Sequence, residues 1–181
     1  MNASTQYLIH TSTPLIFPIA AAIWAAVRSS RRPGERLEIW QRAMLVAAGL
    51  GAAWVGVFFL LAPDVMANEI GFPAGNPFQF EIAFTNLGFA AMAFVLVFRH
   101  RGFRLAYGVG YAIFLWGAAF GHLDQWFAHG DHQPGNTGGI LIVDILVPAA
   151  IIALAIADRR HASDGDRVSV GVGAGPLPAS H

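Results

Sequence analysis

Five long apolar stretches alternate with short polar segments along this chain of 181 residues. An α-helix needs roughly 20 mainly apolar residues to cross about 30 Å of hydrocarbon. The stretches run approximately over residues 7–27, 43–62, 80–98, 105–123 and 140–157. A soluble core of this size could bury one such helix but not five. The pattern therefore predicts an all-α integral membrane bundle of five transmembrane helices.

The basic residues indicate how these helices are oriented. All eleven are arginines: five lie between the first two stretches, three between the third and fourth, and three after the fifth. The segments 63–79 and 124–139 contain none. Arginines accumulate in cytoplasmic loops, so the alternation predicts an N-terminus outside and a C-terminus in the cytoplasm. Residues 1–27 also lack the basic region of a signal peptide, which favours an uncleaved first helix.

Composition excludes several other classes of protein. Apolar residues make up 55% of the chain and charged residues 12%, which excludes general disorder and argues against a soluble domain. The formal net charge is zero, so no basic excess suggests a nucleic-acid partner. The absence of cysteine excludes disulfides and thiolate metal sites. The expected partner is the lipid bilayer.

We expect residues 1–157 to form the transmembrane domain. Residues 158–181 are rich in Gly, Ser, Ala and Pro and are predicted to be a flexible cytoplasmic tail. Small residues at four-residue spacing in the second and fourth stretches let helices approach closely, within one chain or in a homo-oligomer. These residues are Ala48, Ala52, Gly56, Gly117 and Gly121.

Four ionisable side chains are predicted to lie at the same outer membrane level: Glu81, His122, Asp144 and His10. Each is costly in hydrocarbon unless it is paired or hydrated. Imidazole and carboxylate together suit divalent Zn, Fe, Mn, Ni or Cu. Two interpretations stay open, a metal site and a hydrogen-bonded cluster that holds the bundle together. A haem with His10 and His122 as axial ligands is a weaker alternative, because the sequence offers one such pair.

Further polar residues are candidates for supporting this site. Asn86 is expected to make a helix–helix hydrogen bond, because an amide carries no charge to bury. The histidines and acids after residue 123 either assist the site or belong to a solvated loop. The supporting residues are Asn86, Asp124, Gln125, His129, Asp131, His132 and Asn136.

Two prolines fall at the level of the predicted site. A proline within a helix leaves the carbonyl four residues earlier unpaired, so Pro14 frees that of His10 and Pro148 that of Asp144. Irregular backbone at membrane depth is tolerated where it lines a cavity or is buried in protein. An outward-opening pocket and simple packing kinks are equally compatible with this placement.

The last three stretches carry a pattern of polar and small residues. It comprises Glu81-x-x-Phe84-x-Asn86-Leu87-Gly88, then Gly121-His122 with Gln125, then Gly135-Asn136-x-Gly138, and Asp144. The pattern resembles that of a family of small bacterial multi-pass membrane proteins of unknown function. The resemblance implies a location in the cytoplasmic membrane of a bacterium and no assigned activity.

The residues leave three classes of function open, and no reaction is assigned. The first is a metal or enzyme site that faces outward and acts on a small or lipid-like substrate. The second is ion or proton translocation, against which we set the lack of ionisable groups in the inner halves of the predicted spans. The third is an accessory subunit without a site of its own.

The predicted orientation can be tested with a reporter domain fused after Ala162. Five crossings from an outer N-terminus place this position in the cytoplasm, so a cytoplasmic reporter should be active and a periplasmic reporter silent. A periplasmic signal at this position would contradict the five-span topology.

Overall fold

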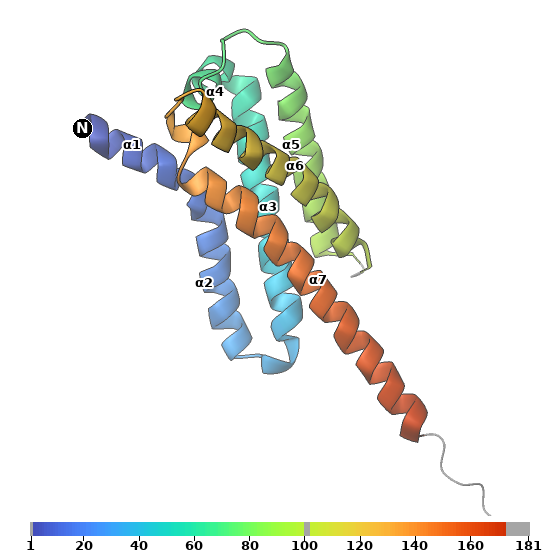
Figure 1. The fold of residues 1–181 in the computed structure, drawn as a ribbon. Coiled ribbons are helices and arrows are strands. Elements are labelled where there is room, and N and C mark those ends of the chain that lie inside the picture. Colours follow the sequence, from blue (N-terminus) through green and yellow to red (C-terminus); the bar gives the residue numbers. More distant parts are fainter. Residues whose placement is uncertain (1, 100–101, 173–181) are drawn as a thin grey trace, which may run out of the picture.

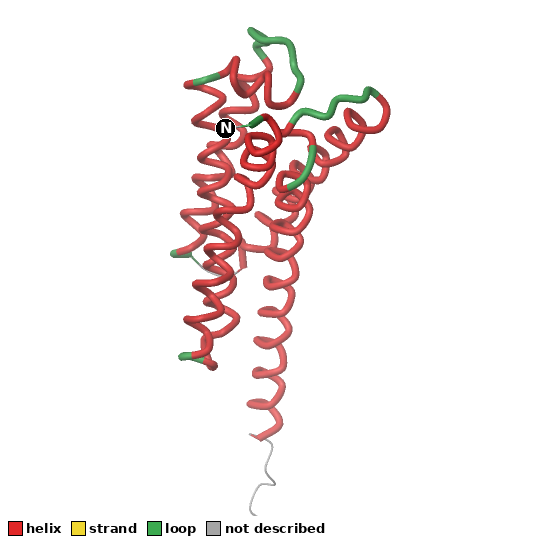
Figure 2. The backbone as a smooth tube through the Cα atoms, turned by 90° about the vertical axis from the view of Figure 1, so that its left-hand side faces the viewer, coloured by secondary structure: helices red, strands yellow, loops and turns green. Residues whose placement is uncertain are grey.

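The chain folds into a bundle of helices, and Figure 2 shows that loops make up only short connections between them. The computed structural model describes the backbone of residues 2–99 and 102–172, and the side chains of residues 2–99 and 102–161. No strand occurs among the described residues. Five helical segments are long and apolar enough to cross a membrane, which confirms the predicted number. They are Ala3–Ser30, Pro33–Leu61, Phe78–Val97, Gly102–Ala128 and Pro134–His161.

Seven α-helices and three short 3₁₀ turns make up the described chain. The α-helices are α1 (Ala3–Ser12), α2 (Ile16–Ser30), α3 (Arg36–Leu61), α4 (Pro63–Ile70), α5 (Phe78–Val97), α6 (Gly102–Ala128) and α7 (Gly139–Val172). The 3₁₀ turns are η1 (Thr13–Leu15), η2 (Pro33–Glu35) and η3 (Pro134–Asn136).

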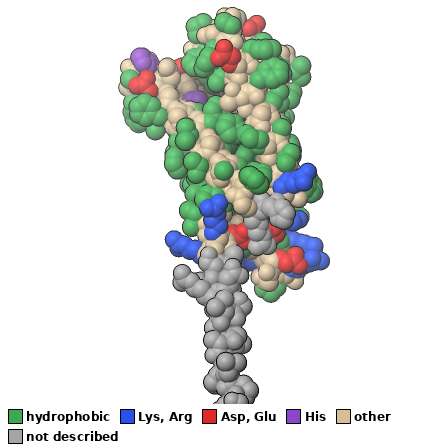
Figure 3. Space-filling model, turned by 90° about the vertical axis from the view of Figure 1, so that its right-hand side faces the viewer, with side chains coloured by type: hydrophobic (Ala, Val, Ile, Leu, Met, Phe, Trp, Pro, Cys, Tyr) green, Lys and Arg blue, Asp and Glu red, His purple; other side chains and the backbone are tan. Residues whose placement is uncertain are grey.

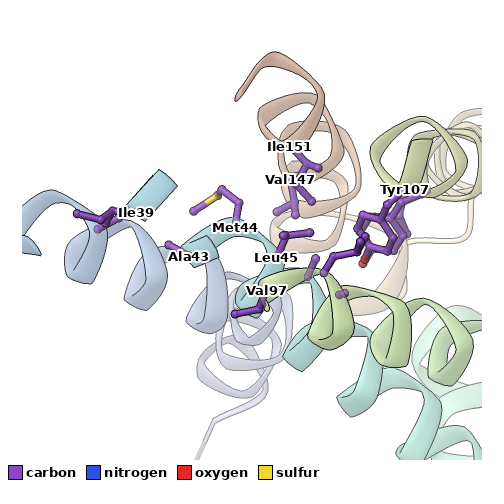
Figure 4. Packing of buried hydrophobic residues seen from close by; sticks show 14 residues of the cluster. Ile39, Ala43, Met44, Leu45, Val97, Tyr107, Val147 and Ile151 are labelled. Atoms are coloured by element: carbon purple, nitrogen blue, oxygen red, sulfur yellow. The ribbon is translucent and has the colours of Figure 1, made fainter. Parts of the chain in front are cut away.

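Helix α3 is the centre of the bundle and packs against α2, α5 and α7 (Figure 1). Its core residues include Leu45, which lies close to Val147 and Ile151 of α7 (Figure 4). The small residues Ala48 and Ala52 are each 2% exposed, and Gly56 is buried against α5. The small-residue spacing of α3 therefore serves contacts within this chain.

The small residues of α6 are placed differently. Gly117 and Gly121 are exposed, and a Cβ atom at either position would meet no other atom within 4 Å. The use of this α6 surface in a homo-oligomer stays a prediction.

The two prolines have different effects on their helices. Pro14 lies in η1, where the first predicted span breaks into α1 and α2, and α1 turns away from the direction of α2 (Figure 1). Pro148 lies within α7, which continues without a break. The Trp116 indole donates to the Ile145 carbonyl at 3.3 Å, one residue after the carbonyl that Pro148 leaves unpaired.

Helix α7 extends beyond its predicted end at Ala157 and continues to Val172. The flexible tail predicted from residue 158 onward stays a prediction, and residues 173–181 lie outside the described part of the chain.

A buried ion pair joins α3 to α6 at the end of the bundle where the arginines gather. Arg104 is 2% exposed, and its two terminal nitrogens donate to the Glu38 carboxylate at 2.7 and 2.9 Å. The Gln41 carbonyl oxygen also accepts from Arg104, and the Gln41 amide donates to the Leu154 carbonyl of α7 at 2.9 Å. Both helices begin earlier than predicted, and Glu38 and Arg104 lie in their first turns, outside the predicted spans.

The close approach of α3 and α5 predicts how a single methyl group affects stability. A Cβ at Gly56 would lie 2.8 Å from the Ala83 carbonyl oxygen, so Gly56→Ala should force the helices apart. We expect a loss of about 1–3 kcal/mol in the free energy of unfolding, measured in detergent micelles.

The matched control is Gly51→Ala in the same helix, where a Cβ meets no other atom within 4 Å. We expect this variant to differ from the wild type by less than about 1 kcal/mol. Equal melting curves for the two variants would show that the α3–α5 contact is not tight.

Candidate polar site at the acidic end

Charged residues divide between the two ends of the bundle. Arginines gather at the end formed by the α2–α3 and α5–α6 connections, which we call the arginine end. Asp64, Glu69, Asp124 and Asp131 lie at the opposite end, which we call the acidic end. Figure 3 shows this division on one face, with arginines in the lower half and histidines in the upper half.

Asn136 is the centre of the polar contacts at the acidic end. It is 1% exposed, and its amide nitrogen donates to the Ile70 carbonyl of α4 at 3.2 Å. Its amide oxygen accepts from Nδ1 of His122 in α6 at 2.9 Å. This one side chain therefore connects α4, η3 and α6.

Glycine makes this arrangement possible. A Cβ at Gly135 would lie 2.6 Å from the Glu69 carbonyl oxygen, so only glycine lets η3 approach α4 this closely. Gly138 has a φ of 64°, a left-handed conformation that glycine adopts without strain, and it packs against Thr11 of α1. The glycines thus bring Asn136 to the end of α4.

His122 faces Asp144 across the interface of α6 and α7. Its Nε2 lies 3.8 Å from Oδ2 of Asp144, and the Asp144 residue is 3% exposed. This distance is too long for a direct hydrogen bond. Because Nδ1 donates to Asn136, Nε2 of a neutral imidazole carries a lone pair. When Asp144 is ionised, two acceptors therefore face each other at this position.

The other two predicted site residues are placed elsewhere. His10 contacts Glu69 of α4, with Nδ1 2.7 Å from Oε1. Glu81 is exposed in the first turn of α5, and its carboxylate has no hydrogen bond or ion pair among the described residues. The structure thus brings together two of the four residues. In the described part of the chain, no three His, Cys, Asp or Glu side chains are grouped as a metal site requires.

The supporting residues form separate contacts. The Asn86 amide donates to the Ile82 carbonyl of its own helix at 2.9 Å, so the predicted bond to another helix is not the one formed. His129 lies 3.4 Å from Asp124, and both side chains are about half exposed. The His132 ring contacts Trp126 with centroids 4.0 Å apart, and the Gln125 carbonyl accepts from the Asp131 amide. Asp124 and Gln125 belong to α6, which extends to Ala128, so the prediction that they lie in a loop is wrong. His129 and His132 lie beyond this helix and are exposed, as a solvated loop requires.

The pattern of apolar stretches does not predict α4, because residues 63–79 lie between two predicted spans. Glu69 and Ile70 of this helix contact His10 and Asn136. The sequence does contain a signal for this helix, since proline favours the first helical position and Pro63 occupies it.

Comparison with known proteins yields one family. A family of unknown function (DUF6790) matches residues 11–164. This match confirms the resemblance to a family of unknown function. No curated protein and no solved structure matches the chain.

The two hydrogen bonds of Asn136 predict that its replacement destabilises the acidic end of the bundle. Asn136→Ala leaves the Ile70 carbonyl and Nδ1 of His122 without their partner, which should cost about 1–3 kcal/mol. We expect faster amide hydrogen exchange in α4 and in residues 134–139, measured by mass spectrometry in detergent. Asn68→Ala serves as the control, because Asn68 is an exposed amide on the same helix α4. Identical exchange in the two variants would contradict this role.

Proposed function

The chain belongs to the DUF6790 family, and we propose that it is an integral membrane protein with a cation-binding site at His122 and Asp144. We place the arginine end in the cytoplasm, following the distribution of arginines, and the membrane is the cytoplasmic membrane of a bacterium. In this orientation the polar site faces outward.

One observation carries the proposal. Nε2 of His122 and the carboxylate of Asp144 face each other at 3.8 Å, and both are acceptors when the imidazole is neutral and Asp144 is ionised. A cation between two such groups replaces their repulsion with two attractions. Asn136 holds the imidazole in this orientation from its other nitrogen, which is the usual arrangement for a histidine that binds an ion.

The spacing is close to that of a divalent transition metal site, whereas a shared proton requires the two side chains to approach to about 3 Å. Metal–ligand distances near 2.1 Å at a tetrahedral angle place a nitrogen and an oxygen ligand about 3.4 Å apart, a few tenths of an ångström closer than observed here. Because the described residues offer two protein ligands, the remaining ligands of a metal would come from water or substrate. Such open coordination is typical of reactive or transient sites, not of structural ones.

Ion or proton translocation is a second candidate function. The structure buries Tyr107 on α6 one turn from Arg104, which is buried at the arginine end. Among the described atoms, the Tyr107 hydroxyl and Nε of Arg104 have no hydrogen-bond partner. Buried donors of this kind can hold water inside a membrane bundle, and intramembrane polar groups often mark ion pathways.

The proposal can be tested by nitrogen NMR of protein labelled with ¹⁵N-histidine, with and without added Zn²⁺ or Mn²⁺. The chemical shift of Nε2 distinguishes a free lone pair, a bond to hydrogen and a bond to metal. We expect a bound state in the wild type, and a changed state in Asp144→Asn. If Zn²⁺ or Mn²⁺ is the cation, affinity should fall by about tenfold or more when this ligand is lost.

The control is Glu81→Gln, which removes an exposed carboxylate of the same end and should leave the His122 signal unchanged. If the chemical shift of His122 Nε2 changes on addition of metal and in Asp144→Asn, the site binds metal. A hydrogen-bonded shift that ignores metal identifies a proton site. A free lone pair in the wild type, or equal effects of the two variants, would overturn the proposal.

A further inference from the structure

A shallow groove lies at the arginine end, between the end of α2 and the beginning of α3. Its volume is about 350 Å³. Its lining combines hydroxyl, guanidinium and indole groups with small apolar side chains. The lining residues are Ala26, Ser29, Ser30, Pro33, Arg36 and Trp40.

The arginines around this groove differ in their pairing. Arg32 pairs with Glu35 at 3.2 Å, and Arg42 pairs with Glu38 at 2.6 Å. Arg28, Arg31 and Arg36 form no ion pair with any described residue. Positive charge is thus left uncompensated at this corner of the bundle, and Arg36 brings it to the groove itself.

The groove adjoins an apolar surface that no other helix covers in the described part of the chain. Helix α2 exposes Ile19, Ile23, Trp24 and Val27, each by about half or more of its surface. Only 11% of the apolar window in the segment Ala3–Ser30 is buried inside the protein. A molecule bound in the groove would therefore have hydrocarbon directly beside it. Trp40 fits this level, since indole side chains favour the membrane interface.

We propose that this groove binds the headgroup of an anionic phospholipid. The Arg36 guanidinium pairs with the phosphate, the geometry that guanidinium groups favour. The acyl chains lie along the exposed face of α2. Basic pockets between transmembrane helices on the cytoplasmic side recognise anionic headgroups in this way. The site is separate from His122 and Asp144 and does not rest on the function proposed for them.

Native mass spectrometry of the full chain in detergent tests this proposal. The probes are phosphatidylglycerol, phosphatidylcholine and inorganic phosphate. We expect the wild type to retain phosphatidylglycerol over phosphatidylcholine. Arg36→Gln should weaken this retention by about fivefold, the contribution of one arginine near an anionic surface. Arg36→Lys keeps the positive charge, so its retention of phosphatidylglycerol should fall less than that of Arg36→Gln.

The matched control is Arg99→Gln, which removes an exposed arginine of the α5–α6 connection at the same end of the bundle. It should retain phosphatidylglycerol as the wild type does. Equal losses in Arg36→Gln and Arg99→Gln would show a general charge effect and overturn the proposed groove. Equal retention of the two lipids would overturn it as well. Displacement of the lipid by inorganic phosphate would identify a phosphate site without lipid specificity, which also contradicts the proposal.

Discussion

The whole structure depends on how closely the other helices can approach α3. Lipid tails are as apolar as the side chains of the spans, so burying apolar surface gives little drive for helices to associate in a bilayer. Close van der Waals packing must supply the attraction instead. Gly49 and Gly56 of α3 allow this, because a Cβ at either position would collide with Phe94 or with the Ala83 carbonyl of α5. With α5 on one side and α2 and α7 on others, α3 fixes the remaining helices around itself.

Polar contacts then hold the two ends of this packed bundle. At the arginine end, Arg104 joins α6 to Glu38 of α3, and Gln41 reaches the backbone of α7. At the acidic end, Asn136 joins the backbone of α4 to His122. Hydrogen bonds of this kind add strength and also select one register between helices, which apolar packing alone specifies poorly.

The sequence predicts those features that depend on the solvent and not on neighbouring helices. The five spans follow from hydropathy, because each helix must satisfy its own backbone in lipid wherever its neighbours lie. Helix ends are less well determined. Glu38 and Arg104 lie just outside the apolar stretches because each is charged, yet each offsets the charge of the other and both helices extend over them.

The residues of the candidate site also divide into those that the sequence predicts and those that depend on neighbouring helices. His122 and Asp144 were selected because ionisable residues in apolar helices require an explanation, and the structure places them 3.8 Å apart. Their other partners could not be predicted in this way. His10 contacts Glu69 because η1 turns α1 across the end of the bundle, and Glu69 belongs to a helix that apolar periodicity does not reveal. Such pairings depend on crossing angles and loop paths, which no local pattern of residues encodes.

The buried carboxylates at the two ends of the bundle differ in whether they have a directly bonded basic partner. Glu38 accepts from Arg104 at 2.7 and 2.9 Å and from Arg42 at 2.6 Å, so this carboxylate is neutralised and directly hydrogen-bonded. Such an arrangement needs no further ligand and serves stability. Asp144 is more deeply buried than Glu38, and its nearest described basic group is an imidazole beyond hydrogen-bonding distance. A buried carboxylate in this setting gains far more from a proton or cation than a fully paired one does. This asymmetry is the reason for proposing the cation site at the acidic end and a structural role for the ion pair at the arginine end.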